Sequence, residues 1–483
     1  MNDETIRIKR NSLFAFGSSA VRLVANGILF IGIARFYGPK AFGQFTAAHT
    51  LSIIFLLLAD FGFDVLLTSE IARNRRKTTV LVYTYLSMKI IFSLIGVSAM
   101  LLTTYLGNMS DSTKLLMYVL SFYVFFSALT NYFFALFKGF NEFSHETKIT
   151  LLMNGFLIVT VFILGYIHTP LTMIAIAFVI SRIIGLFFAI IIGNRFVSLD
   201  KFQFAFPTKE QFLMIAVFGF HAIFSTLFFV QDTILLSMWR GDREVGIYQA
   251  VFKLIAVVFV VPDVIMTALL PILSNYNVEN LERWKTLGQM MNKTLFLIGL
   301  PIAAILFIYS EQIIFFLYGQ TEYLEAIPVL RIFSVITFLH FSTISCALML
   351  TTAHRQITRT FIVILATLLN YSLNYFMIPN YGPIGAAIVS LATILFVGIC
   401  YAGAMRSFFI RWICNMHYAV PFVATLLTAI IMWHARLIPL WYIIIPFAGW
   451  YGIIFYFFGY TKQERALIFG SGKVSMLLEK YTH

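Results

Sequence analysis

The chain has 483 residues, of which 60% are hydrophobic and only 11% are charged, and its formal net charge is +13. A soluble globular domain has about 45–50% apolar and about 25% charged residues, so this composition excludes a water-soluble enzyme and a disordered chain. The apolar residues stand in unbroken runs and do not alternate with polar ones, which excludes a transmembrane β-barrel and leaves an all-α, polytopic membrane protein.

Long apolar runs predict the membrane-spanning helices. A helix needs about 20 mostly apolar residues to cross the hydrocarbon core. The N-terminal run lacks a small-residue cleavage motif and is therefore predicted to be a retained first helix. Fourteen spans are expected, in chain order 11–35, 42–69, 79–105, 115–137, 149–167, 170–192, 210–238, 249–273, 294–317, 329–352, 360–378, 383–405, 418–435 and 438–460.

The basic residues predict the orientation of these helices. With the N-terminus in the cytoplasm, 23 of the 34 Lys and Arg residues fall in cytoplasmic segments and 6 in external ones. This asymmetry predicts that both termini are cytoplasmic. It also explains the net positive charge without nucleic acid, for which the chain offers no soluble basic domain. All predicted loops are short, so we expect the function to lie within the bilayer.

Motifs of enzymes and metal sites are missing. The sequence has no GxxxxGK[ST], HExxH or GxSxG motif and no CxxC spacing, so we expect no catalytic residue, metal ligand, disulfide or bound cofactor. Three histidines in the spans are far apart in sequence, and hydrogen-bonded interior residues are a better interpretation than metal ligands. They are His49, His221 and His340.

The two halves of the chain contain an internal sequence repeat. Segments 38–45 and 241–248 each begin with glycine, have a second glycine five positions later and end with an aromatic residue. Each segment joins an outgoing span to an incoming one. The first span thus corresponds to the seventh and the second to the eighth, with the same membrane orientation. We therefore expect two parallel six-helix lobes, 1–195 and 196–405, related by an axis along the membrane normal, and a further pair of helices with a cytoplasmic tail in 406–483. Two such lobes are an architecture for alternating access, which points to a transporter.

Basic residues inside the spans point to an anionic substrate. A charge at the bilayer centre costs at least about 2.5–3.5 kcal/mol and needs a partner, a wet cavity or a function. Arg22 lies near the middle of the first span, with Asn26 one helical turn later, and Arg182, Lys89 and Lys253 are also deep. A cavity presenting these groups suits an anionic head group such as a pyrophosphate, which arginine binds by bidentate hydrogen bonds.

Acidic residues in the spans have two open interpretations. Asp60 and Asp64 are four residues apart on one predicted helix, and Asp263 is the repeat mate of Asp60. They serve either structural ion pairs or gating and ion coupling. Lys89 has the alternative of pairing with Asp60 or Asp64.

One further acidic residue, Asp232, lies toward the end of its span. A mutual salt bridge with Lys253 is its predicted role, and gating or coupling is the alternative.

The order and spacing of several short motifs resemble a known family. The chain is similar to the Wzx-type polysaccharide flippases of the multidrug/oligosaccharidyl-lipid/polysaccharide (MOP) exporter superfamily, over roughly residues 10–405. The motifs that carry the resemblance are Tyr37-Gly-Pro-Lys-Ala-Phe-Gly-Gln-Phe45, Ala59-Asp-Phe-Gly-Phe63, Glu70-Ile-Ala-Arg73, Asp232-Thr-Ile-Leu-Leu236, Val245-Gly-Ile-Tyr-Gln-Ala250, Pro271-Ile-Leu-Ser274 and Tyr381-Gly-Pro-Ile-Gly-Ala-Ala387.

The resemblance implies a MATE-like pair of six-helix bundles in the bacterial inner membrane. It implies a monomeric flippase for undecaprenyl-pyrophosphate-linked oligosaccharide, with a cation-lined cavity and coupling to H+ or Na+. Polysaccharide polymerase machinery and membrane lipids are the implied partners. Arg22 matches an arginine that the family tends to place in the first span, whereas fourteen spans exceed the usual twelve. Teichuronic-acid, peptidoglycan-precursor and multidrug exporters remain alternatives, followed by a membrane glycan polymerase and a scaffold.

Overall fold

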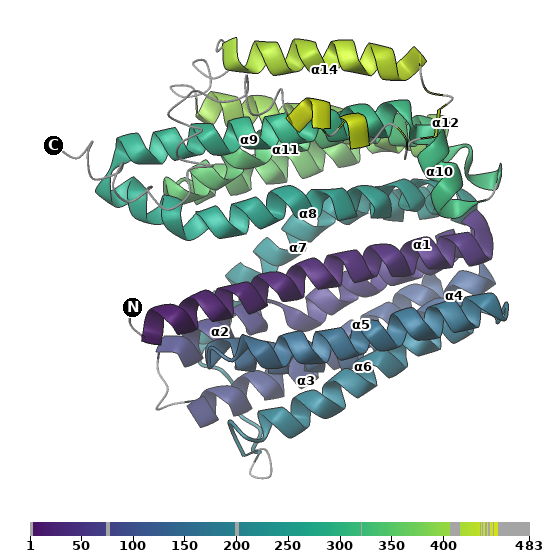
Figure 1. The fold of residues 1–483 in the computed structure, drawn as a ribbon. Coiled ribbons are helices and arrows are strands. Elements are labelled where there is room, and N and C mark those ends of the chain that lie inside the picture. Colours follow the sequence, from purple (N-terminus) through teal and green to yellow (C-terminus); the bar gives the residue numbers. More distant parts are fainter. Residues whose placement is uncertain are drawn as a thin grey trace. The chain divides into compact units, whose positions relative to one another are not determined.

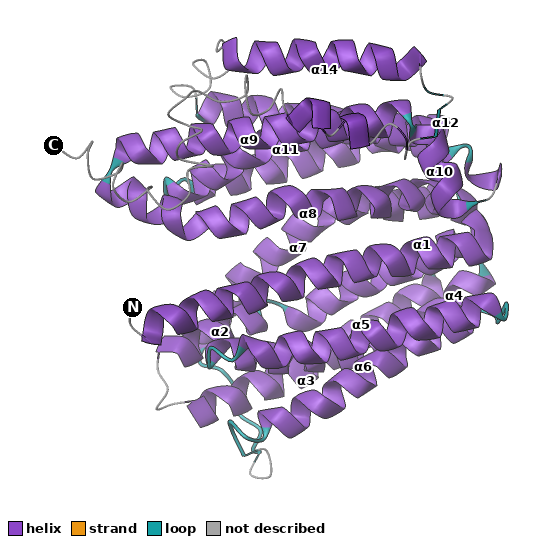
Figure 2. Ribbon diagram, in the orientation of Figure 1, coloured by secondary structure: helices purple, strands orange, loops and turns teal. Residues whose placement is uncertain are grey.

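The computed structural model describes residues 3–73, 78–198, 202–319, 321–405, 416–434, 436, 438–439, 442, 445–447 and 449–452. Within these residues every regular element is a helix, as Figure 2 shows. Nine of the described helices are long and apolar enough to cross a membrane. The prediction of an all-α, polytopic membrane protein is confirmed.

The helices follow one another with short connections. They are α1 (Asp3–Asp60), α2 (Phe63–Arg73), α3 (Thr78–Leu106), α4 (Asp111–Gly139), α5 (Phe143–Tyr166), α6 (Leu171–Gly193), α7 (Lys209–Trp239), α8 (Asp242–Glu279), α9 (Leu281–Ile308), α10 (Ser310–Tyr318), the 3₁₀ helix η3 (Thr321–Tyr323), α11 (Ala326–Thr352), α12 (Gln356–Ala404) and α14 (Met416–His434). Two of them, α1 and α12, are each a pair of helices joined at a glycine with positive φ, Gly38 (φ 76°) and Gly382 (φ 54°).

The predicted spans and the observed helices correspond closely. The first thirteen predicted runs all coincide with described helices, but 42–69 and 294–317 are each divided between two helices. The fourteenth, 438–460, lies mainly outside the described residues, so the count of fourteen stays a prediction. The ninth helix begins at Leu281, earlier than the predicted residue 294, because the polar stretch before the apolar run continues the helix. Asn280 caps it by accepting a hydrogen bond from the backbone N–H of Arg283 at 3.0 Å.

Two predicted spans are interrupted. The run 294–317 is divided between α9, which ends at Ile308, and α10, which begins at Ser310. The run 42–69 was expected to be continuous, but α1 ends at Asp60 and α2 begins at Phe63. Phe61 (φ 41°) and Gly62 (φ 84°) between them both have a left-handed backbone, which no α-helix accommodates. Hydropathy does not detect this break because, apart from Asp60 and Asp64, the residues near it are mostly apolar.

The chain forms two compact units. The first contains residues 1–260, 317–326 and 367–389, and the second contains 261–316, 327–366 and 390–483. In the first unit α1 packs against α3, α4 and α5, and α4 packs against α6 (Figure 1). In the second unit α9 packs against α14, and Ile308, Tyr309, Met432 and Phe447 form a buried cluster. The division into lobes 1–195 and 196–405 stays a prediction.

The two repeat segments contact each other inside the first unit. Their first glycines, Gly38 (φ 76°) and Gly241 (φ 91°), both adopt the positive φ that a tight turn requires, which confirms the predicted turns. Their second glycines lie against the opposite segment. A Cβ atom on Gly43 would meet the carbonyl oxygen of Asp242, and one on Gly246 would meet the carbonyl oxygen of Pro39. The two backbones therefore touch where each segment lacks a side chain.

A carboxylate strengthens this contact. Asp242, the first residue of α8, accepts hydrogen bonds from Gln44 Nε2 at 3.1 Å, Ser110 Oγ at 2.8 Å and Thr113 Oγ1 at 3.2 Å. The three donors come from α1 and from the start of α4. The turn before α8 is thus held by backbone packing and by charge-assisted hydrogen bonds.

Replacing Gly43 by Ala is expected to lower thermal stability. The new methyl group would collide with backbone of the opposite segment, and overpacking of this kind costs about 1–3 kcal/mol. Gly155→Ala in α5 is the matched control because a Cβ there meets nothing within 4 Å. That control should be neutral or stabilising by about 0.5–1 kcal/mol. Unfolding of the detergent-solubilised variants, followed by intrinsic fluorescence, measures both, and equal midpoints would contradict the prediction.

Candidate functional site

An aromatic cluster surrounds His49 in the first unit. His49 lies on α1, where Phe45 is one turn earlier and stacks on its ring with the centroids 6.0 Å apart. Phe30 of α1 lies 5.3 Å away, and Tyr123 of α4 and Phe178 of α6 both lie 5.6 Å away, measured between ring centroids. All five side chains are buried. The cluster fixes the imidazole by packing from three helices.

Two cations border this aromatic cluster. Lys253 of α8 places Nζ 4.1 Å from the ring centroid of Phe30. Arg182 of α6 places Cζ 5.0 Å from the ring centroid of Tyr123 and donates a hydrogen bond from Nη2 to Tyr123 Oη at 3.1 Å. Both residues are partly exposed. The cations are held by aromatic contacts, and neither forms an ion pair within the described part of the chain.

Two buried nitrogen atoms of the site have no hydrogen-bond partner among the described residues. They are His49 Nδ1 and Arg182 Nε. The expectation that His49 is a hydrogen-bonded interior residue is therefore wrong for Nδ1. An unpaired buried polar atom costs about 1–3 kcal/mol, so such atoms call for an explanation. We name the group formed by Arg182, Lys253, His49 and the four aromatic residues around His49 the cation–aromatic site.

Lys89 forms ion pairs with two carboxylates and is not part of the cation–aromatic site. Its Nζ lies 2.6 Å from Asp60 Oδ1 and 2.8 Å from Asp64 Oδ1, and its side chain is fully buried. The alternative in which Lys89 pairs with these carboxylates is confirmed, and its assignment to the substrate stays a prediction. Asp60 and Asp64 do not share a face of one helix, because the chain breaks at Phe61 and Gly62. Lys89 joins them across that break.

Asp232 has different partners from the predicted one. Its carboxylate accepts hydrogen bonds from Tyr248 Oη and from Asn374 Nδ2, each at 2.7 Å, and Asn374 Nδ2 also lies 2.7 Å from Asn370 Oδ1. The predicted salt bridge between Asp232 and Lys253 is wrong, because Lys253 lies against Phe30. Asp232 is buried on α7, and its carboxylate is hydrogen-bonded by a hydroxyl group of α8 and an amide group of α12.

The remaining predicted site residues are Arg22, Asn26 and Asp263. The side chain of Arg22 lies outside the described residues. Asn26 is exposed on α1, one turn before Phe30. Asp263 is exposed on α8 in the second unit, and its carbonyl oxygen accepts a hydrogen bond from Thr267.

Sequence reasoning did not predict that His49 and its aromatic neighbours pack beside Arg182 and Lys253. The available signal was the one-turn spacing of Phe45 with His49 and of Phe178 with Arg182, which puts each pair on one helix face. That spacing does not reveal that the two faces meet.

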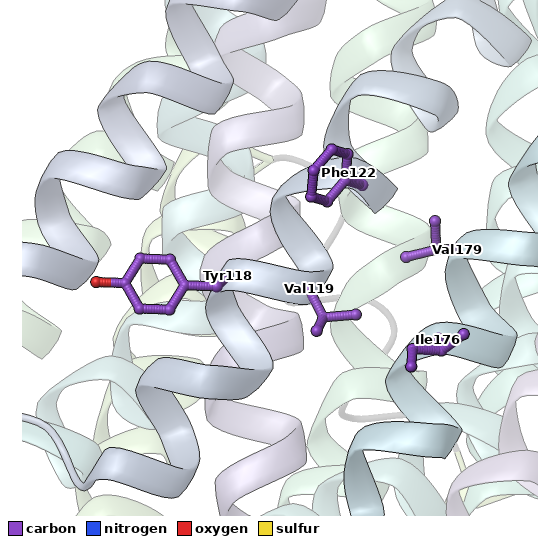
Figure 3. A pocket seen from close by; sticks show the side chains of 5 residues that line it. All are labelled: Tyr118, Val119, Phe122, Ile176 and Val179. Atoms are coloured by element: carbon purple, nitrogen blue, oxygen red, sulfur yellow. The ribbon is translucent and has the colours of Figure 1, made fainter.

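An apolar pocket in the first unit has a different character. It has a volume of about 340 Å³ and lies between α4 and α6, as Figure 3 shows. It is lined by Tyr118, Val119, Phe122, Ile176 and Val179. None of these side chains carries a charge, so the pocket does not suit a charged head group.

The sequence matches two protein families. Residues 8–277 match the family described as "Polysaccharide biosynthesis protein". Residues 218–376 match the family described as "MatE". The first match covers more than half of the chain, including both repeat segments and the whole cation–aromatic site.

Individual proteins are also similar. The chain is 24% identical over 404 residues to a Shigella flexneri protein named "Putative O-antigen transporter". The aligned region covers 79% of this chain and 93% of that protein. The fold of this chain is similar to that of the lipid II flippase MurJ in an inward closed conformation, with a TM-score of 0.73 and 16% identity. The similarity covers 92% of this chain and 98% of the MurJ chain. The fold is also similar to that of an inward-facing multidrug resistance MATE transporter of the MOP superfamily, with a TM-score of 0.66 and 16% identity, over 80% and 95% of the two chains.

Proposed function

The chain belongs to the family of polysaccharide biosynthesis proteins, and we propose that it is a flippase for undecaprenyl-pyrophosphate-linked oligosaccharide repeat units. The family match, the name of the Shigella flexneri relative and the fold shared with a lipid II flippase support this function. These relatives are transporters, and the chain has many apolar helices. A multi-pass membrane transporter therefore fits better than an enzyme.

The cation–aromatic site carries the proposal. Arg182 and Lys253 are the two cations of the site, and both lie within membrane-spanning helices. A diphosphate that links a lipid to a sugar carries about two negative charges at neutral pH, which two cations neutralise. Arg182 adds directional hydrogen bonds, which phosphate oxygens accept in pairs. Arg22 and Asn26 on α1 remain candidates for further contacts to the same head group.

Coupling to H+ or Na+ is part of the proposal. Asp60, Asp64 and Lys89 together carry one excess negative charge when all three are ionised, which a bound proton or monovalent cation would neutralise. The buried carboxylate of Asp232 is a second candidate coupling site, because cations such as Na+ prefer oxygen ligands and Asp232 and Asn370 supply them. Asp263 is the repeat mate of Asp60 and is proposed to act in gating.

Alternating access is the proposed mechanism. Two lobes, 1–195 and 196–405, would rock around the bound head group in a monomer of the inner membrane, with both termini in the cytoplasm. The turns at Gly38 and Gly241, which share their glycine spacing and their positive φ, support the repeat on which this mechanism depends. The flipped repeat unit would then pass to polysaccharide polymerase machinery.

Deletion of the gene tests the proposed function. We expect surface polysaccharide to be lost and lipid-linked repeat units to accumulate in the cytoplasmic leaflet. Extraction of the lipid-linked oligosaccharides, with a membrane-impermeant glycosidase added to intact spheroplasts, measures their amount and their leaflet. Unchanged surface polysaccharide would contradict the proposal.

A multidrug exporter is the second candidate. The match of residues 218–376 to the MatE family favours it. The positive charges of Arg182 and Lys253 oppose it, because they would repel a cationic drug. The same deletion strain distinguishes the two functions, since a multidrug exporter predicts sensitivity to cationic dyes with normal surface polysaccharide.

A further inference from the structure

We propose that His49 is a specificity-determining residue that donates a hydrogen bond from Nδ1 to a phosphoryl oxygen of the substrate's diphosphate. The inference rests on the proposed function, because it names a third contact to the same head group. It assigns a task to a side chain that was expected to be an ordinary interior histidine.

The first argument is the unpaired atom. His49 is 7% exposed, and its buried Nδ1 has no hydrogen-bond partner in the part of the chain that the structure describes. A neutral imidazole carries one N–H, which either ring nitrogen can bear. Burial without a partner is unfavourable, so an Nδ1–H group at this place is a donor that a bound acceptor would satisfy.

The second argument is that His49 shares an aromatic neighbour with each cation. Tyr123 contacts His49 and also accepts the hydrogen bond of Arg182. Phe30 contacts both His49 and Lys253. The imidazole therefore lies one aromatic ring away from each cation, and Arg182 Nε, the second unpaired donor, belongs to the same group.

The third argument is the count of charges. Arg182 and Lys253 already balance the two negative charges of a diphosphate diester. An uncharged donor adds a directional contact without adding a third positive charge. A third charge would lose its hydration in the empty site, and this desolvation costs free energy. The aromatic rings hold the imidazole in one orientation, so little side-chain entropy is lost on binding. His49 thus helps the site to distinguish a diphosphate from an uncharged or zwitterionic lipid head group.

Binding of farnesyl diphosphate to the purified full-length protein in nanodiscs tests the inference. His49→Phe keeps an aromatic ring among the neighbouring rings but removes the donor, and affinity should fall about 10–100-fold, the value expected for a hydrogen bond to a charged group. His49→Gln keeps an N–H donor and should bind within about threefold of the wild type. Farnesol, which lacks the diphosphate, should bind the three proteins equally. His49→Leu is the second variant without a donor, for use if His49→Phe fails to fold.

The outcomes separate this inference from the proposed function. If Arg182→Ala weakens binding but His49→Phe and His49→Leu bind as the wild type does, the role of His49 is overturned and the anion site stands. If His49→Gln binds as weakly as His49→Phe, a hydrogen bond from His49 is likewise refuted. If the wild type binds farnesyl diphosphate no better than farnesol, the anion site itself fails, and the inference fails with it.

Discussion

Lys89→Met is expected to destabilise the folded protein by about 3–5 kcal/mol, the cost of removing one partner from a buried ion pair. The ammonium of Lys89 is fully buried and contacts two carboxylates at 2.6 and 2.8 Å. Without it, Asp60 and Asp64 would face each other uncompensated at the break between α1 and α2. Because the carboxylates are 22% and 18% exposed, solvent relieves part of this repulsion, and we expect the lower end of the range. The thermal unfolding midpoint in detergent measures the effect.

A second lysine provides the matched control. Lys285 of α9 pairs with Glu282 at 2.7 Å, but Glu282 is 82% exposed. Lys285→Met should change stability by no more than about 1 kcal/mol, as exposed ion pairs do. The double variant Lys89→Met with Asp64→Asn should recover part of the loss, because it removes one of the two unpaired charges. Equal midpoints for Lys89→Met and Lys285→Met would show that the buried group does not hold the break together.

Arg182→Ala is expected to reduce transport about 10–100-fold without preventing insertion or folding. The substitution removes a charge-assisted hydrogen bond to the substrate, a loss of about 1.5–3 kcal/mol, and each 1.36 kcal/mol in the barrier is a factor of ten in rate. Arg182→Lys keeps the charge but loses the planar fork of donors, so its transport should be intermediate. The measurement is the amount of surface polysaccharide that each variant restores in the deletion strain at matched protein levels.

Arg243 is the control for this experiment. Its guanidinium binds Glu325 through two hydrogen bonds of 2.8 and 3.0 Å and is 45% exposed, away from the cation–aromatic site. Arg243→Gln removes the same charge from the protein and should restore polysaccharide to within about twofold of the wild type. Full restoration by Arg182→Ala would refute the role of Arg182 in binding the head group.

The membrane-spanning helices could be predicted because bilayer thickness fixes how long an apolar run must be. The runs at 79–105 and 210–238 differ by only one residue at each end from α3 and α7. Where the prediction failed, the cause was local. The break at Phe61 and Gly62 is a matter of backbone conformation, and the polar start of α9 is helical without being apolar. A hydropathy pattern reports neither.

The deep cations could be located in the sequence, but their partners could not. Lys89 and Lys253 look alike in sequence, as single lysines in apolar runs. The structure gives one of them two carboxylates and the other the face of Phe30. The partner of Lys253 is on α1, more than two hundred positions away, and no local spacing points to it.

The sequence by itself determined the class of the protein, the places of most spans, the two glycine turns and the list of charges that require an explanation. These follow from transfer free energies and backbone geometry, which act on each segment independently of the others. Only the tertiary structure decided that Lys89 is neutralised, that Asp232 is held by Tyr248 and Asn374, and that Arg182 and Lys253 border a histidine with an unpaired nitrogen. The physical reason is that a buried charge is stabilised by whichever groups neighbouring helices bring within a few ångströms, and the helices that become neighbours are selected by packing over the whole chain.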